Sequence, residues 1–320
     1  MKRLGIKIHA FDKGGVVLGR KTKVAISVSA VGIAAWAASK VVVKPTVRKG
    51  KKALQFDNPI VLAYRGGLFD APENTLSAFT NSASLGVHGF YVDIRLTKDE
   101  EILVFHDEYL DNTTNLIGKV ADFTLKELKE ADAGYAYTNE DGKYPFRGKG
   151  EKLLSLNELL ERFPHMLISI NISESPDTYE GSLLPSKLWR LIEEYDAADR
   201  ITVTSAFDEQ IDRFNLYAQN RVALGAGDDE VKKSYAAYAS QFGHLYNPPA
   251  DIFQVSEKLG IFSLRSGGFI DYLAKLNIPI YYKDVEDQNT ILVLIKNGAA
   301  GFITSNPEQV MQIILENTID

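Results

Sequence analysis

The stretch that decides the fold reads Ile60-Val61-Leu62-Ala63-Tyr64-Arg65-Gly66-Gly67 and continues as Ala71-Pro72-Glu73-Asn74-Thr75. Its first part is an apolar run ending in Arg-Gly-Gly, which predicts a buried strand with a cation and open backbone at its carboxyl end. Two further runs, Phe90-Tyr91-Val92-Asp93-Ile94-Arg95 and Val104-Phe105-His106-Asp107, repeat this arrangement. Sites in α/β proteins are built at the carboxyl ends of strands, so ends carrying Arg, Asp and His indicate a phosphate site.

Strand-like and helix-like segments alternate from residue 58 onward. We expect barrel strands at 60–64, 89–96, 167–172, 201–205, 221–224, 244–247, 279–285 and 301–304, with a further strand at 102–105. We expect helices at 75–85, 155–163, 183–195, 209–219 and 288–296, and a closing helix after Pro307. Such alternation favours a (β/α)8 barrel of the TIM type, and an open doubly wound sheet is the alternative.

Side-chain alternation predicts which residues face the barrel interior, because successive side chains of a strand point to opposite faces. In segment 89–96, Phe, Val and Ile share one face, whereas Tyr91, Asp93 and Arg95 share the other. In segment 167–172, isoleucines alternate with Ser169 and Asn171. We expect the polar faces to point inward and to belong to the barrel mouth.

The composition limits the classes of function. The chain has 320 residues, 45% of them hydrophobic and 24% charged, which allows one large α/β domain and a small appendage. The net charge of −6 argues against a nucleic-acid partner. Cysteine is absent, which excludes disulfides and thiolate metal sites.

The first fifty-odd residues differ in character from the rest. A basic segment, 1–23, precedes an uncharged run that is interrupted at Lys40, and a basic linker, 44–57, follows. If Lys40 reaches the interface, residues 24–43 supply the roughly 20 residues that a transmembrane helix needs. We therefore expect a membrane anchor joined to a barrel at 58–320, with the linker against anionic headgroups. A signal peptide cleaved at Ala35-Trp36-Ala37 and an ordinary hydrophobic helix are the alternatives.

The order of these motifs resembles the glycerophosphodiester phosphodiesterase family. The resemblance runs from about residue 59 to residue 310, and it rests on Pro72-Glu73-Asn74-Thr75 and His106-Asp107 at the family's spacing. It implies a TIM-type barrel, a divalent cation and two catalytic histidines. It also implies that residues 111–152 are an insertion over one side of the barrel mouth, and that Glu73 and Asn74 keep the family's loop chemistry.

The chain departs from the family at the metal positions. The resemblance implies Glu-x-Asp on the second strand and a carboxylate on the third, where this chain has Tyr91, Asp93 and Asn171. Mg²⁺ and Ca²⁺ bind several oxygen ligands, with carboxylates supplying the charge. A tyrosine, with an ordinary pKa of about 10, is a poor ligand near neutral pH. We expect a weak or vestigial metal site at Asp93 or none, and Tyr91 as a core-filling aromatic.

The acid–base pair also departs from the family. His106 keeps the second histidine, whereas Tyr64 replaces the first, and a phenol does not exchange protons near pH 7 as imidazole does. Arg65 is expected to bind phosphate, with a structural ion pair as its alternative. Lys283 replaces a family tryptophan and is expected to supply positive charge to phosphate, with a solvated rim position as its alternative.

We therefore read the chain as a membrane-anchored family member with a degenerate site. It is expected to bind a glycerophosphodiester, a phospholipid headgroup or a polyglycerophosphate, with little or no hydrolysis. The alternative is an active phosphoric diester hydrolase with altered catalytic residues, and a third interpretation is a structural scaffold at the membrane. The sequence indicates no particular protein partner.

Overall fold

The computed structural model describes residue 36 and residues 38–317. The chain divides into two compact units, Met1–Lys44 and Pro45–Asp320. Most of the predicted transmembrane helix, 24–43, and all of the segment 1–23 lie outside the described residues. Within the described residues, the structure contains no helix with the length and apolar character needed to cross a bilayer.

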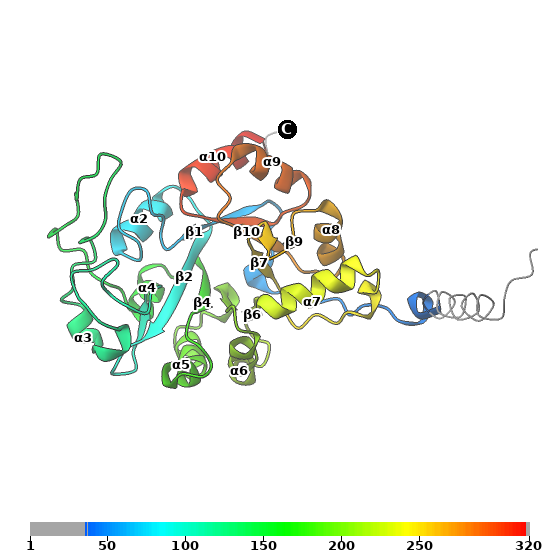
Figure 1. The fold of residues 1–320 in the computed structure, drawn as a ribbon, viewed down its shortest axis with the longest axis horizontal. Coiled ribbons are helices and arrows are strands. Elements are labelled where there is room, and N and C mark those ends of the chain that lie inside the picture. The colour runs from blue at the N-terminus through cyan, green and yellow to red at the C-terminus, as the bar shows by residue number, and fades with distance from the viewer. Residues whose placement is uncertain (1–35, 37, 318–320) are drawn as a thin grey trace, which may run out of the picture. The chain divides into compact units, whose positions relative to one another are not determined.

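The second unit is a TIM-type barrel, as predicted (Figure 1). Parallel strands follow one another around it in the order β6-β5-β4-β2-β1-β11-β10-β7, and a parallel bridge between Gly225 and Ile252 links the two outermost strands. Their bounds are β1 (Ile60–Tyr64), β2 (Gly89–Leu96), β4 (Leu167–Ile172), β5 (Ile201–Thr204), β6 (Ala223–Leu224), β7 (Phe253–Val255), β10 (Ile280–Lys283) and β11 (Gly301–Thr304). The barrel brings the carboxyl ends of all these strands to one mouth.

Helices surround the strands (Figure 1). They are α2 (Leu76–Ser84), α4 (Leu156–Arg162), α5 (Tyr179–Glu194), α6 (Asp208–Ala218), α7 (Asp228–Ala239), α8 (Gly267–Lys275), α9 (Gln288–Lys296) and α10 (Pro307–Asn317). The large core lies between these helices and the outward faces of the strands, and a smaller interior cluster includes Leu62, Tyr91 and Tyr281. The predicted alternation along 89–96 and 167–172 is confirmed, because their apolar residues belong to the outer core.

The segment 102–152, which includes the predicted insertion 111–152, forms a small structured unit. Strand β3 (Ile102–Val104) pairs antiparallel with β2, and the chain then forms the 3-10 turn η2 (Val120–Asp122) and helix α3 (Leu125–Leu128). These elements enclose their own core, which includes Phe105, Leu110 and Leu128. At Thr124, as at Ser155 before α4, the side chain accepts a backbone N–H while a glutamate three residues later caps it in return.

The prediction of a strand at 244–247 is wrong. That segment overlaps the 3-10 turn η4 (Gly243–Leu245), and the sixth barrel strand is β7. A strand of three residues is too short to show the alternation that identifies longer strands. The helices α7 and α8 and the hairpin of β8 (Lys258–Leu259) and β9 (Phe262–Ser263) were also not predicted.

The compact unit begins at Pro45, whereas the sequence placed the start of the barrel domain at residue 58. Part of the predicted basic linker packs against the amino-terminal ends of the strands. Arg48 forms a salt bridge of 2.7 Å with Asp251, and its backbone N–H donates to the carbonyl of Leu276. The 3-10 turn η1 (Lys52–Leu54) follows, and Leu54 packs against the interior cluster.

Candidate functional site

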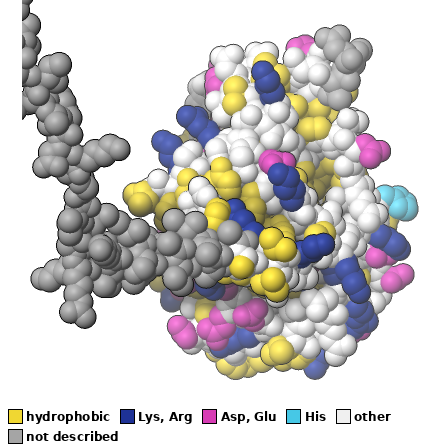
Figure 2. Space-filling view, turned by 90° about the vertical axis from the view of Figure 1, so that its right-hand side faces the viewer, with side chains coloured by type: hydrophobic (Ala, Val, Ile, Leu, Met, Phe, Trp, Pro, Cys, Tyr) yellow, Lys and Arg dark blue, Asp and Glu magenta, His cyan; other side chains and the backbone are white. Residues whose placement is uncertain are grey.

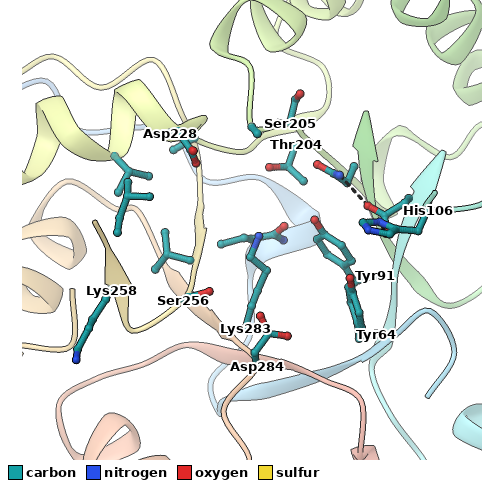
Figure 3. A pocket seen from close by; sticks show the side chains of 18 residues that line it. Tyr64, Tyr91, His106, Thr204, Ser205, Asp228, Ser256, Lys258, Lys283 and Asp284 are labelled. Carbon is teal, nitrogen blue, oxygen red and sulfur yellow. Dashed lines mark hydrogen bonds and ion pairs between the residues drawn. The ribbon is translucent and has the colours of Figure 1, made fainter. Parts of the chain in front are cut away.

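A cavity of about 270 Å³ opens at the carboxyl ends of the strands (Figure 3). Six of the predicted site residues line it: five lie on strands β1, β2, β4 and β10, and His106 follows β3. Its lining comprises Tyr64, Tyr91, Asp93, His106, Asn171, Thr204, Ser205, Ala206, Ala226, Asp228, Val231, Gln254, Val255, Ser256, Lys258, Leu259, Lys283 and Asp284. Arg65, Glu73 and Asn74 do not line this cavity.

Asp93 is the centre of one wall of the cavity. Its side chain is 2% exposed, and one carboxylate oxygen, Oδ2, lies 2.9 Å from Nδ1 of His106 and 3.3 Å from Nε of Arg65. The other oxygen, Oδ1, accepts hydrogen bonds from the Asn171 amide at 2.7 Å and from the Ser173 hydroxyl at 3.2 Å. Both oxygens of this carboxylate are therefore bonded within the protein.

The surroundings of Asp93 keep it ionised. Burial by itself raises its pKa, but the hydrogen bond from His106, the charges of His106 and Arg65, and the hydrogen bond from Asn171 outweigh burial, so that the pKa is lowered. The negative charge in turn favours one orientation of the His106 imidazole. The ring presents Nδ1 to Asp93, and its side chain remains 41% exposed beside the cavity.

Arg65 lies in an ion-pair cluster behind the cavity. Its guanidinium contacts Glu73 at 2.9 Å, Asp93 at 3.3 Å and the Tyr64 hydroxyl at 2.5 Å, and its side chain is 12% exposed. Burial lowers the pKa of Arg65, but Glu73, with Tyr64 and Asp93, outweighs it, so that the pKa is raised. This arrangement matches the alternative of a structural ion pair, and phosphate binding by Arg65 stays a prediction.

The local backbone explains why Arg65 is held so firmly. Arg65 and Asn74 both have positive φ, 52° and 57°, and the N–H of Asn74 donates to the carbonyl of Arg65 at 2.8 Å. Gly66 has φ of 86°, and a Cβ there would lie 2.9 Å from Ala78 Cβ and 3.1 Å from the backbone nitrogen of Phe79. Only glycine therefore fits the close contact of this turn with helix α2.

Tyr64 and Tyr91 both line the cavity, at the positions where the family resemblance implies a histidine and a glutamate. Their rings lie 5.6 Å apart between centroids. Burial raises the pKa of Tyr64 to about 12 and raises the pKa of Tyr91 well above its usual range, with the charge of Asp93 adding to both shifts. Tyr91 is 3% exposed and belongs to the interior cluster, which agrees with its interpretation as a core-filling aromatic. Both phenols are uncharged near neutral pH.

The side-chain atoms around Asp93 do not suit the coordination of a hard divalent cation. Asn171 directs its amide nitrogen, a donor, at Asp93 rather than offering a free carbonyl oxygen. Tyr91 is a neutral phenol, and the Asp93 oxygens are bonded to other residues. Across residues 36 and 38–317, no group of three or more acidic or histidine side chains is placed to hold a metal ion. The residues present therefore do not fit the cation that the family resemblance implies.

Lys283 lies on the side of the cavity away from His106. Its side chain extends from the end of β10 toward the middle of the cavity beside Tyr91, whereas Lys258 points away from the middle (Figure 3). The Lys283 ammonium is 5.6 Å from the centroid of the Tyr91 ring. Among the described residues, no carboxylate lies within ion-pair distance of this ammonium, whereas Arg65 and Arg95 are both paired with carboxylates.

Several lining residues were not anticipated from the sequence. Gln254 lies on β7, the strand that was placed wrongly, and Ser256 follows it; Thr204 ends β5, and Ser205 follows it. Inward alternation identifies Gln254 once β7 is known, because Ile252 two residues earlier belongs to the interior cluster. No local signal in the sequence marks these residues as part of the site.

Comparison with known proteins agrees with this architecture. The profile of the "Glycerophosphoryl diester phosphodiesterase family" matches residues 65–309. A "Glycerophosphodiester phosphodiesterase" of Caldanaerobacter subterraneus subsp. tengcongensis is 30% identical over 264 residues, which cover 80% of this chain and 97% of that protein. One of the same name from Bacillus altitudinis is 35% identical over 145 residues, 45% of this chain and 57% of its own length.

Solved structures show the same fold. The glycerophosphoryl diester phosphodiesterase domain of a Mycobacterium tuberculosis protein superposes with a TM-score of 0.69 at 18% identity, covering 80% of this chain and 99% of that one. An Oleispira antarctica phosphodiesterase in complex with the product sn-glycerol-3-phosphate superposes with a TM-score of 0.64 at 19% identity, covering 80% and 97%.

Proposed function

Because this chain belongs to the glycerophosphoryl diester phosphodiesterase family, we propose that it binds a glycerophosphate-containing ligand in the cavity and hydrolyses it little or not at all. The ligand class is a glycerophosphodiester, a phospholipid headgroup or a polyglycerophosphate. Support comes from the position of the cavity at the barrel mouth and from the hydroxyl and amide groups on its walls, which suit a polyol. The sn-glycerol-3-phosphate bound to the Oleispira antarctica phosphodiesterase is a ligand of this kind.

The bonding of Asp93 is the observation that carries the proposal. Metal-assisted hydrolysis requires a cation that polarises the phosphoryl group, and such a cation needs several oxygen ligands. Here Asp93 is the one acid among the three family positions, and both of its oxygens are already bonded. We therefore propose that Mg²⁺ or Ca²⁺ binds weakly or not at all. Loss of one member of an acid–base pair lowers the rate by about 10²–10⁴-fold in addition.

A second candidate is an active phosphoric diester hydrolase, which the pairing of His106 with Asp93 favours. A carboxylate on Nδ1 orients an imidazole so that Nε2 is available for proton transfer. In a hydrolase of this design, His106 serves as general acid or base, and Tyr64 donates a hydrogen bond in place of the missing histidine. The names of the relatives support hydrolysis as an activity of the family.

The proposal also covers the location of the barrel at a membrane. We propose that residues 24–43 anchor the chain in a membrane, on the basis of their length, their lack of acidic residues and the basic segments on either side. Nucleic acid is not proposed as a partner. The net charge is −6, and basic and acidic side chains are intermixed on the face of the molecule in Figure 2.

Two measurements on the purified protein test the proposal. Calorimetric titration with glycerol 3-phosphate in the presence of EDTA is expected to show binding. Hydrolysis of glycerophosphocholine, followed by glycerol 3-phosphate release, is expected to stay at background with and without millimolar Mg²⁺ or Ca²⁺. Turnover that disappears in His106→Ala would instead establish the hydrolase, and absence of both binding and turnover would favour a structural scaffold.

A further inference from the structure

The cavity has an unused hydrogen-bond donor in its wall. Gln254 is 6% exposed, and its Oε1 accepts a hydrogen bond from the Ser169 hydroxyl at 2.9 Å. Its Nε2 is buried and has no hydrogen-bond partner among the described residues. A buried amide N–H without a partner destabilises the fold, so such a group in a binding cavity points to a ligand that accepts its hydrogen bond.

Strand register places this donor beside Lys283, which has no ion-pair partner among the described residues. β10 pairs in parallel with β7, and Tyr281 is the partner of Gln254. Lys283 lies two residues further toward the mouth on the same inward face as Tyr281. The Cα atoms of Gln254 and Lys283 are therefore roughly 8 Å apart, from the strand spacing and the rise per residue. Side chains of this length can converge on one small group between them.

The chemistry of this pair suits an anion. An ammonium and an amide N–H are both donors, and together they can bind two oxygens of one phosphate group. Across the cavity, both oxygens of Asp93 are bonded within the protein, and Arg65 is paired with Glu73 and Asp93, so neither side chain offers a free donor to an anion. Gln254 and Lys283 thus supply hydrogen-bond donors on one wall, which Asp284 and Asp228 also line, and Asp93 lies on the wall opposite.

We propose that Gln254 Nε2 and Lys283 Nζ together form the phosphate-binding subsite, and that it holds phosphate without a metal ion. Arg65 in this arrangement is a positioning residue, which holds Asp93 in place and does not contact the ligand. The glycerol part of the ligand then lies toward Asn171 and Thr204, whose polar side chains also line the cavity. This inference rests on the proposed binding function and assigns the groups that recognise the ligand.

Calorimetric titration with glycerol 3-phosphate in EDTA tests the subsite. Lys283→Met is expected to weaken binding about 10- to 100-fold, the usual effect of losing a charge-assisted hydrogen bond. Gln254→Met, which keeps the volume and removes the donor, is expected to weaken it about two- to tenfold. Gln254→Glu keeps the shape and the bond from Ser169 but pairs with Lys283, and it is expected to weaken binding at least as much as Lys283→Met.

Lys296→Met is the matched control, because Lys296 is an exposed lysine in the last turn of α9, on the outer side of the barrel. Each variant is first compared with the parent by circular dichroism, and a crystal structure with glycerol 3-phosphate locates the phosphorus directly. Phosphate within hydrogen-bond distance of Gln254 Nε2 supports the proposal. If Lys283→Met and both Gln254 variants bind glycerol 3-phosphate with the wild-type affinity, or if the phosphate contacts Arg65 instead, the proposed subsite is wrong but the binding function stands. Failure of the wild-type protein to bind would overturn the binding function with it.

Discussion

Removal of the segment just before the barrel should destabilise it, although no barrel strand begins before Ile60. The reason is Arg48, whose Nε and Nη2 contact Oδ1 of Asp251 at 2.8 Å and 2.7 Å. The Asp251 side chain is 2% exposed, and its other oxygen accepts the backbone N–H of Leu224 at 3.0 Å. Without Arg48, a buried carboxylate between β6 and β7 loses its direct ion-pair partner.

The magnitude follows from this burial. Breaking a buried ion pair by removing one partner costs about 3–5 kcal/mol, because the remaining charge stays buried. Arg48 is 20% exposed, so water offsets part of the loss and the lower end, about 3 kcal/mol, applies. For a domain of this size, 1 kcal/mol corresponds to about 2–4 °C in Tm. We therefore expect Arg48→Met to lower Tm by about 6–12 °C.

The assay compares thermal unfolding of two truncated chains, two single variants and one double variant. The chain that begins at residue 45 should have the same Tm for barrel unfolding as the full-length protein. The chain that begins at residue 53 lacks Arg48 and should have a Tm several degrees lower. Lys49→Met is the matched control, since Lys49 is exposed and is expected to change Tm by about 1 °C or less. Asp251→Asn added to Arg48→Met should restore part of the loss by removing the buried charge. Equal Tm values for the two truncations, or for Arg48→Met and Lys49→Met, would refute this reasoning.

Three further predictions concern the site and the amino terminus. The pKa of Asp93 is lowered in the folded protein, so its ionised form stabilises the fold above the unfolded pKa of about 3.9, and this contribution is lost as pH falls through the lower folded pKa. Asp93→Asn should therefore reduce the free energy of unfolding, measured in urea, more at pH 7 than at pH 3. An equal reduction at both pH values would contradict this role of Asp93. The triple variant Tyr64→His, Tyr91→Glu, Asn171→Glu should gain metal-dependent hydrolysis of glycerophosphocholine and a Tm that rises with Mg²⁺ or Ca²⁺, and a folded variant without either gain would show that substrate positioning also differs. Full-length protein should remain in the alkaline-washed membrane pellet, whereas a shortened protein in the medium would indicate a cleaved signal peptide and full-length protein in the supernatant would argue against both.

Much of the fold was predictable because its signals are local. The strand at 60–64 and the helix that starts after Thr75 follow from an apolar run, a turn and an N-cap, all within 25 residues. The inward direction of Asp93 and Asn171 follows from the two-residue period of a strand. The gathering of Asp93, His106 and Asn171 at one mouth follows from the parallel barrel, which brings the carboxyl ends of strands together whatever their distance in sequence.

The tertiary structure decided which partners the charged groups have. The sequence predicts that Arg65 binds phosphate, but in the structure the turn at Gly66 and the loop that carries Glu73 hold its guanidinium against carboxylates. Gln254 lies on a strand of three residues, too short to carry a pattern, and becomes part of the site only through its pairing with β10.

The basic segment before the barrel shows the same division. As a sequence, residues 44–57 are a charged linker, and the ion pair that attaches Arg48 to the barrel joins residues separated by 203 positions. The sequence by itself determined most of the longer strands and several helices, and which side chains of those strands face inward, because those depend on neighbours within a few residues. Which cation meets which anion depends on distances in space between remote segments, so only the folded chain determined it.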